Sequence, residues 1–283
     1  MRKDYSRIAV HPMTGALGAA IGGIDLTDRL DNETVSEIHD AYLDHLVLFF
    51  RDQTLTPDQL KDFARHFGDL HIHPLTEGMP DHPEIVEVIK EPEEYHNWGD
   101  GWHTDLPILE EPPLGSVLYA REVPPFTGDT HFANMYLAYE TLSDTMKGIL
   151  NGLKCVYEAG VANYNRFKGM TAIEDAGDYV AAHPIARTHP VTGKKALFLH
   201  RKNSKCIEGM SVRESFAILD FLFDHAQNPD FSCRFRWRRD SIAMWDNRCA
   251  QHRVSGDYFY TERDISPARR HLQRVTMKGG RPY

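Results

Sequence analysis

Ile242-Ala243-Met244-Trp245 is a run of apolar side chains that leads directly into the polar block Asp246-Asn247-Arg248. Runs of this kind, rich in β-branched and aromatic residues, recur from Glu84 onward. They are Ile85 to Ile89, Ser116 to Ala120, Asp129 to Ala133, Ala196 to His200, Phe231 to Trp237, Ile242 to Trp245 and Leu272 to Met277. Several short strands separated by turns predict a mainly β fold, a sandwich or jelly roll.

Helical signals flank these strands. Apolar side chains recur at helical spacing over residues 35–46, and the apolar run from Leu46 to Phe50 then predicts a buried strand. The capping box Thr56–Gln59 opens a second helix, which Gly68 ends. A second capping box, Ser211–Glu214, opens another helix. We therefore expect helices packed around a β core.

The charge balance excludes some functions. The chain has 32 Lys and Arg against 41 Asp and Glu, a formal net charge of -9, which argues against coating nucleic acid or an anionic membrane. The segment Met1–Tyr5 lacks the apolar stretch of a signal peptide, and no apolar run of about 18 residues is present to span a bilayer. The four cysteines form no CxxC pair and are expected to be reduced thiols. These features predict a cytoplasmic protein.

The chain shows no internal repeat, low-complexity tract or Gly/Ser linker, so a single domain over residues 1–283 is expected. Residues 151–183 are polar and only weakly periodic, which favours a lid inserted over a pocket, with an ordinary surface excursion as the alternative. An enzyme of this size is expected to be a homo-oligomer, a dimer or a tetramer.

Two segments far apart in the sequence carry candidate metal ligands. In an extended segment, His103 and Asp105 point to the same side and can converge on one ion. His252 supplies a second imidazole downstream of the Ile242 to Trp245 strand. Two His and one carboxylate leave open positions on iron(II), where a bidentate oxoacid and O2 can bind together. Zinc is the competing interpretation of the same ligands.

A basic segment near the C-terminus favours iron over zinc. An enzyme that uses 2-oxoglutarate needs a cation for the far carboxylate, and the planar guanidinium of Arg grips both oxygens. Arg269, Arg270 and Arg274 supply candidates. In a strand, Arg270 and Arg274 share a face and lie roughly 13 Å apart, so each can meet a different anion. Solvated surface arginines are the alternative.

Several ordered blocks together resemble the taurine dioxygenase (TauD/TfdA) family, over nearly the whole chain from about Ile8 to Pro282. The blocks are His103-Thr104-Asp105, Thr127-Gly128-Asp129-Thr130, His183-Pro184 through Lys194, Trp245-Asp246-Asn247-Arg248 with His252, and Arg269-Arg270 with Arg274. The resemblance implies a double-stranded β-helix, the cupin-like jelly roll. It also implies an Fe(II)- and 2-oxoglutarate-dependent dioxygenase that consumes O2, hydroxylates a small organic anion and releases succinate and CO2.

The resemblance also assigns roles to individual residues. It implies that His103, Asp105 and His252 bind Fe(II), with no catalytic residue beyond this metal centre. It places the 2-oxoglutarate contacts on Thr130 and Arg270. It places the substrate contacts on His73, Arg274 and Phe198.

Three positions depart from the taurine enzymes. Those enzymes carry a Tyr where this chain has Thr76 and an Asn where it has Gly99, so two polar partners of taurine are missing. The interval from His252 to Arg270 is also longer, with residues 259–266 predicted as an inserted turn. The first two changes favour a bulkier substrate, such as an aryloxyalkanoate or a longer sulfonate.

Other functions compete with this interpretation. Arg234, Arg236 and Arg238 alternate with aromatic residues, which suggests a nucleic-acid or protein substrate, although a strand with Arg outward and aromatics inward explains the pattern more simply. A jelly-roll binding protein without chemistry is a second alternative, against which the complete ligand set argues. A zinc hydrolase is a third and would need a general base besides Asp105.

Overall fold

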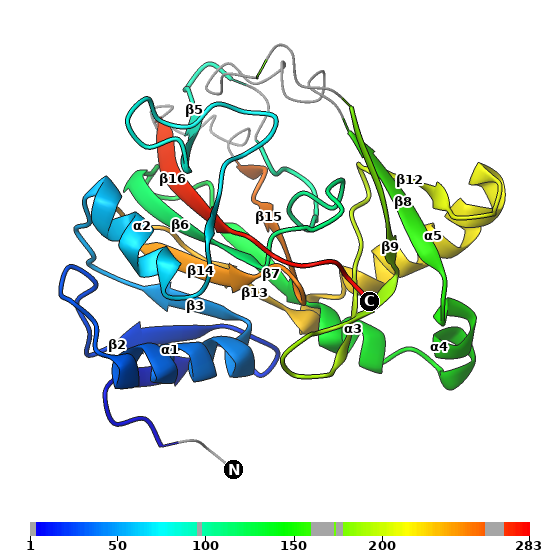
Figure 1. Ribbon diagram of the computed structural model, residues 1–283, viewed down its shortest axis with the longest axis horizontal. Coiled ribbons are helices and arrows are strands. Elements are labelled where there is room, and N and C mark those ends of the chain that lie inside the picture. Colours follow the sequence, from blue (N-terminus) through cyan, green and yellow to red (C-terminus); the bar gives the residue numbers. More distant parts are fainter. Residues whose placement is uncertain (1–3, 95–97, 160–172, 174–177, 258–268) are drawn as a thin grey trace.

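The computed structural model describes residues 4–94, 98–159, 173, 178–257 and 269–283. It is mainly β with flanking helices, as predicted (Figure 1). The strands are β1 Ala9–Pro12, β2 Ala19–Gly22, β3 Val47–Phe50, β4 Leu70–His71, β5 Ile85–Lys90, β6 Gly115–Glu122, β7 Thr130–Asn134, β8 Lys154–Ala159, β9 Tyr179–Pro184, β10 Ala186–Thr188, β11 Lys195–Leu197, β12 Ser204–Ile207, β13 Ser232–Phe235, β14 Ile242–Asp246, β15 Ala250–Val254 and β16 Arg270–Met277. The helices are α1 Asn32–His45, α2 Pro57–Arg65, α3 Met135–Glu140, α4 Asp144–Leu150, α5 Val212–Ala226 and the short 3-10 helix η2 Pro229–Phe231.

Two facing sheets form the jelly roll. The larger sheet has the order β1-β2-β3-β14-β6-β16-β4, with β5 also paired to β16, and the smaller has the order β13-β7-β15. Aromatic side chains from both sheets meet between them. The Phe49 ring of β3 stacks on Phe235 of β13 at 4.1 Å between centroids, and Phe132 of β7 lies 5.8 Å from Trp245 of β14. Burial of these rings holds the two sheets together.

The opposite face of the larger sheet is covered by α1 and α2 (Figure 1). The Phe50 ring contacts Phe63 of α2 at 5.5 Å between centroids, and Tyr42 of α1 donates a hydrogen bond to the Trp245 carbonyl at 2.8 Å. The central strand β3 is therefore buried on both sides, which explains its unbroken apolar run.

Local signals in the sequence place two helices correctly. Both predicted capping boxes form, at Thr56 with Gln59 and at Ser211 with Glu214. Helix α2 ends at Arg65, earlier than the predicted stop. Helices α3 and α4 and the strands β1, β2, β4, β8, β9, β10, β12 and β15 were not predicted from the sequence. Their segments are too short to show a clear period, and they depend on tertiary packing.

The polar segment predicted as a lid begins and ends in strands. Strands β8 and β9 pair along their whole length in antiparallel register. Residues 160–172 and 174–177, between these strands, lie outside the described residues, so the lid stays a prediction. The inserted turn predicted at 259–266 also lies outside them.

The arginine strip follows the simpler of its two interpretations. Arg234, Arg236 and Arg238 are exposed, whereas Phe235 and Trp237 between them are buried in the core. The alternation is that of an extended chain with one face inward. Within the described residues, no helix is long and apolar enough to cross a membrane.

Gly115 leaves room for a close approach between β6 and its neighbours. A Cβ added there would lie 2.3 Å from the Tyr42 hydroxyl and 2.5 Å from the Trp245 carbonyl oxygen. We expect Gly115→Ala to lower the free energy of unfolding by about 2 kcal/mol, because overpacking forces backbone shifts. Gly148→Ala is the matched control, since nothing lies within 4 Å of the added carbon. Equal urea midpoints for the two variants would contradict this expectation.

Candidate metal centre

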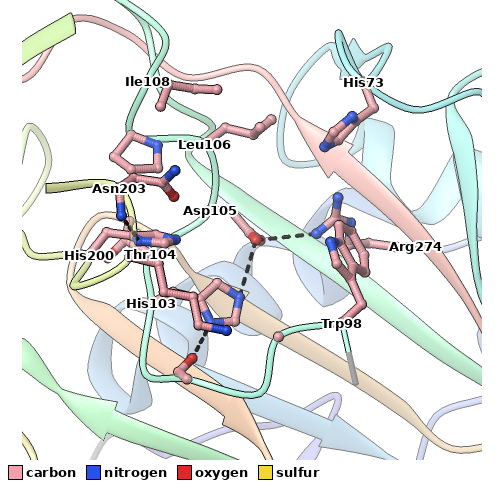
Figure 2. A pocket seen from close by; sticks show the side chains of 14 residues that line it. His73, Trp98, His103, Thr104, Asp105, Leu106, Ile108, His200, Asn203 and Arg274 are labelled. Carbon is pink, nitrogen blue, oxygen red and sulfur yellow. Dashed lines mark hydrogen bonds and ion pairs between the residues drawn. The ribbon is translucent and has the colours of Figure 1, made fainter. Parts of the chain in front are cut away.

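Three side chains from two segments converge at the mouth of the roll. His103 and His252 exchange two backbone hydrogen bonds, each 3.0 Å long, which sets the His103–Asp105 segment against the edge of β15. The Asp105 Oδ1 atom lies 3.8 Å from His103 Nε2 and 3.9 Å from His252 Nε2. The three ligand atoms all lie within 4.8 Å of one another, and Figure 2 shows His103 and Asp105 of this group. This separation suits three ligands of one metal ion.

Both imidazoles are suited to be neutral ligands. His103 Nδ1 lies 2.7 Å from the Gly101 carbonyl, so it carries the proton and leaves the Nε2 lone pair facing Asp105. Burial is the main cause that lowers the pKa of His103 and holds that of His252 well below its usual range. A metal binds the unprotonated ring nitrogen that these shifts favour.

Asp105 is held as a carboxylate. Burial acts to raise its pKa, but the positive charge of Arg274 and the hydrogen bond from Ser116 outweigh burial and leave the pKa well below its usual range. Arg274 Nη1 lies 3.2 Å from Asp105 Oδ1 (Figure 2), and the Ser116 hydroxyl donates to Oδ2 at 3.2 Å. The ligand set is therefore two neutral imidazoles and one anion.

Asn247 fixes the backbone at Asp105, a role that the sequence did not reveal. Its side-chain oxygen accepts the Asp105 N–H at 2.7 Å, and its amide donates at 3.0 Å to the carbonyls of Asp105 and Pro113. The contact joins residues 142 positions apart. Only its place in the Trp245 to Arg248 block distinguished it in the sequence.

We expect Asn247→Ala to weaken Mn(II) binding about tenfold to a hundredfold, because loss of a group that orients a ligand has costs of this size. Mn(II) is an air-stable stand-in for Fe(II) and can be titrated by calorimetry. Asn151→Ala, at the exposed C-cap of α4, is the control and should bind as the parent does. Unchanged affinity in a folded Asn247→Ala protein would show that the amide does not position Asp105.

Two cavities meet beside the candidate ligands. The larger, of about 400 Å³, is lined by His73, Trp98, Gly99, Gly101, His103, Thr104, Asp105, Leu106, Pro107, Ile108, His200, Lys202, Asn203 and Arg274. The smaller, of about 50 Å³, is lined by Val88, Trp98, Gly99, His103, Leu118, Thr130, Trp245, His252, Val254, Arg270 and Arg274. Arg270 and Arg274 thus reach the same cavity from β16, as a shared strand face predicts.

The predicted cosubstrate residues line the smaller cavity. Arg270 is only 5% exposed and Thr130 only 3%. The Thr130 hydroxyl accepts a hydrogen bond from Trp237 Nε1 at 2.9 Å, which fixes its orientation. A buried guanidinium and a fixed hydroxyl beside a metal centre are suited to bind a carboxylate.

His73 and Arg274 lie on one side of the larger cavity (Figure 2). His73 Nδ1 accepts hydrogen bonds from the backbone N–H groups of Leu75 and Thr76 and lies 2.8 Å from the Thr76 hydroxyl. The ring proton is therefore on Nε2. Arg274 also stacks on Trp98, with its Cζ 4.3 Å from the ring centroid.

Phe198 is not on the wall of either cavity. Its ring is 1% exposed and packs against His183 at 5.7 Å between centroids and against the Arg187 guanidinium at 4.9 Å. Strand β11 ends at Leu197, so the chain turns before the predicted strand is complete. As a result, His200 lines the cavity and Phe198 does not.

A second group of potential ligands, His189, Asp246 and Cys249, is buried elsewhere among the described residues. Arg248 binds both oxygens of Asp246, at 2.8 and 2.7 Å, and His189 Nε2 lies 3.0 Å from the same carboxylate. The nitrogen of His189 that faces away accepts backbone N–H groups. These contacts make the group a structural ion-pair network, not a metal site.

The sequence of residues 9–276 matches the family model described as "Taurine catabolism dioxygenase TauD, TfdA family". The chain belongs to the TauD/TfdA family. It is 31% identical to an alkylsulfatase of Acinetobacter baylyi, over 99% of this chain and 87% of that protein. It is 32% identical to an alpha-ketoglutarate-dependent 2,4-dichlorophenoxyacetate dioxygenase of Cupriavidus pinatubonensis, over 95% and 97% of the two chains. A taurine dioxygenase structure from Burkholderia xenovorans superposes with a TM-score of 0.83 at 34% identity, covering 98% of this chain and 91% of that one.

Membership of the TauD/TfdA family confirms the fold and reaction class predicted from the sequence. The chain has the family's cupin-like jelly roll. It is an oxidoreductase that depends on 2-oxoglutarate and a metal and hydroxylates small organic anions. The family does not decide which anion.

Proposed function

We propose that His103, Asp105 and His252 bind Fe(II), and that the chain couples decarboxylation of 2-oxoglutarate to hydroxylation of a small sulfonate, sulfate ester or aryloxyalkanoate. The observation that carries the proposal is the convergence of two neutral imidazoles and one carboxylate next to buried arginines. Fe(II) bound there supplies O2 activation, with one oxygen atom entering the substrate and the other entering succinate.

Arg270 and Thr130 are proposed to bind the far carboxylate of 2-oxoglutarate. Arg270 supplies charge and two parallel N–H donors, whereas Thr130 supplies a hydroxyl whose oxygen is already held by Trp237. Both are almost inaccessible to solvent, so their hydrogen bonds to a carboxylate are little screened. Their contribution is the position of the oxoacid relative to the metal ligands.

Arg274 and His73 are proposed to bind the anionic group of the substrate. A metal cation at Asp105 takes over the charge that Arg274 now compensates, which leaves the guanidinium available to a second anion. His73 adds a neutral N–H donor, because its Nδ1 already accepts hydrogen bonds. Hydroxylation of a carbon that bears an ether or ester oxygen gives a product that breaks down at that carbon.

The contacts of Thr76 and Gly99 bear on the two positions at which this chain departs from the taurine enzymes. The hydroxyl of Thr76 contacts His73, so it is directed at the ring and not at a substrate amine. Gly99 has a φ of +83°, and a Cβ there would lie 3.1 Å from His103 Cε1. Leu106, Pro107 and Ile108 add an apolar wall. Such a cavity favours alkyl or aryl bodies over the amine of taurine.

Succinate formation tests the proposal. We expect anaerobically purified protein with Fe(II), 2-oxoglutarate and O2 to form succinate, and a subset of alkylsulfonates, alkyl sulfates or aryloxyalkanoates to stimulate it with product in equal amount. Zn(II) in place of Fe(II) is the control and should support no turnover. Succinate formation that ignores every anionic candidate would contradict the substrate class, and none at all with iron would contradict the reaction.

A further inference from the structure

A second group of polar side chains lines the larger cavity, on the side of the metal ligands away from Arg274 and His73 (Figure 2). His200, Lys202 and Asn203 come from the short connection between β11 and β12. The His200 ring lies 5.6 Å from that of His103, between centroids, so it adjoins the metal centre. The larger cavity therefore has one polar end at Arg274 and His73 and a second polar end at His200, Lys202 and Asn203. The candidate metal ligands lie between the two ends.

The connection that carries these residues is fixed from three directions. Tyr157 of β8 donates to the Phe198 carbonyl at 2.6 Å, and Gln251 of β15 donates to the Leu199 carbonyl at 2.6 Å. The Ser204 hydroxyl donates to the His200 carbonyl at 2.8 Å. Because these donors belong to or adjoin strands, the polar end is built into the fold and is preorganised for a ligand.

His200 presents a hydrogen-bond donor without charge. Its Nδ1 accepts the Asn203 N–H at 3.1 Å, which leaves the ring proton on Nε2. A ring whose Nδ1 accepts a hydrogen bond carries only one proton, so this contact makes the imidazole neutral. The residue is 8% exposed, through the cavity that it lines.

The charges at this end are balanced within the protein. The Lys202 ammonium forms an ion pair with Asp100, and neither His200 nor Asn203 adds a charge. At the other end, Arg274 faces a carboxylate that a metal would neutralise. A second anion at the His200 end would therefore gain little electrostatic free energy of binding. A neutral acceptor, by contrast, would gain a hydrogen bond in a site that is largely shielded from water.

We propose that His200 is the donor of a second substrate subsite, which selects organic anions that also carry a neutral oxygen acceptor, such as an ether or carbonyl oxygen. The inference rests on the proposed function, because it assumes that the anion binds at Arg274 and His73. It predicts a substrate with two polar groups on either side of the carbon that reacts, and an apolar body against Leu106, Pro107 and Ile108.

Binding to the protein loaded with Mn(II) and N-oxalylglycine tests this inference without turnover. Two pairs of acids differ by one oxygen in place of a methylene: phenoxyacetate with phenylpropionate, and para-methoxyphenoxyacetate with para-ethylphenoxyacetate. In at least one pair we expect the acid with the extra oxygen to bind about fivefold tighter, the size of one neutral hydrogen bond. His200→Leu should abolish this preference, and His200→Gln, which retains an N–H donor, should keep most of it.

Each of the following results would overturn the inference. The first is equal affinity within both pairs for the parent protein. The second is a preference that persists in His200→Leu. The third is a change in N-oxalylglycine affinity in His200→Leu, which would place the residue at the cosubstrate. Iron-dependent succinate formation measured in parallel separates these outcomes from failure of the proposed function, and binding of none of the four acids would contradict both polar ends together.

Discussion

Asp105→Ala is expected to abolish turnover and to weaken Mn(II) binding on the order of a thousandfold. The substitution removes the sole anion among the three candidate ligands and leaves Arg274 buried beside two imidazoles. A cation entering that site would meet an uncompensated guanidinium. Removing one partner of a buried ion pair costs about 4 kcal/mol, which corresponds to a thousandfold in affinity. Calorimetric titration with Mn(II) and iron-dependent succinate formation measure the two losses.

Cys249→Ala is the matched control for Asp105→Ala. It removes one potential ligand of the other buried group, next to the ion pair of Asp246 with Arg248. We expect one Mn(II) per chain with unchanged affinity, and turnover close to that of the parent. A loss of the bound ion in Cys249→Ala, together with retention in Asp105→Ala, would move the metal to the Asp246 network and contradict the proposed ligand set.

Local chemistry explains what the sequence could predict of the fold. Capping boxes at Thr56 and Ser211 act within three residues, so both helices begin where predicted. The run Ile242 to Trp245 predicts a strand, and the structure explains why the run is apolar throughout, since β14 is buried along its whole length. By contrast, the strand predicted over 196–200 ends at Leu197, since the backbone at 200–204 forms turns through the Ser204 hydroxyl and N–H groups.

In the candidate site, too, only the arrangement of residues close together in the sequence could be predicted. His103 and Asp105 are close in the sequence, and their shared side of the chain was predictable. The contacts that complete the site join distant residues, as Asn247 does at Asp105 and His200 does at His103. Neither contact has a local signal. The cytoplasmic location and the homo-oligomeric state stay predictions.

Arg270→Leu is expected to raise the KM for 2-oxoglutarate about a hundredfold and to weaken N-oxalylglycine binding equally. A charged hydrogen bond to a carboxylate contributes about 1.5–3 kcal/mol, and its loss in a buried site falls at the upper end of that range. Arg270 is 5% exposed and lines the smaller cavity with Thr130 and His252. Loss of the guanidinium leaves the cosubstrate carboxylate facing Leu118 and Val88, which cannot solvate it.

Arg274→Leu, compared with Arg270→Leu, distinguishes the binding roles of the two arginines of β16, which share a strand face and a cavity. If each binds a different anion, this variant should retain N-oxalylglycine affinity within about threefold, while stimulation by the organic anion is lost and succinate forms without product. Because Arg274 also forms an ion pair with the candidate ligand Asp105, both variants are compared at saturating Mn(II) or Fe(II). If Arg274→Leu lost binding of the oxoacid and Arg270→Leu lost binding of the substrate, the two assignments would be reversed. If each variant weakened the binding of both ligands equally, the two arginines would act together on one anion.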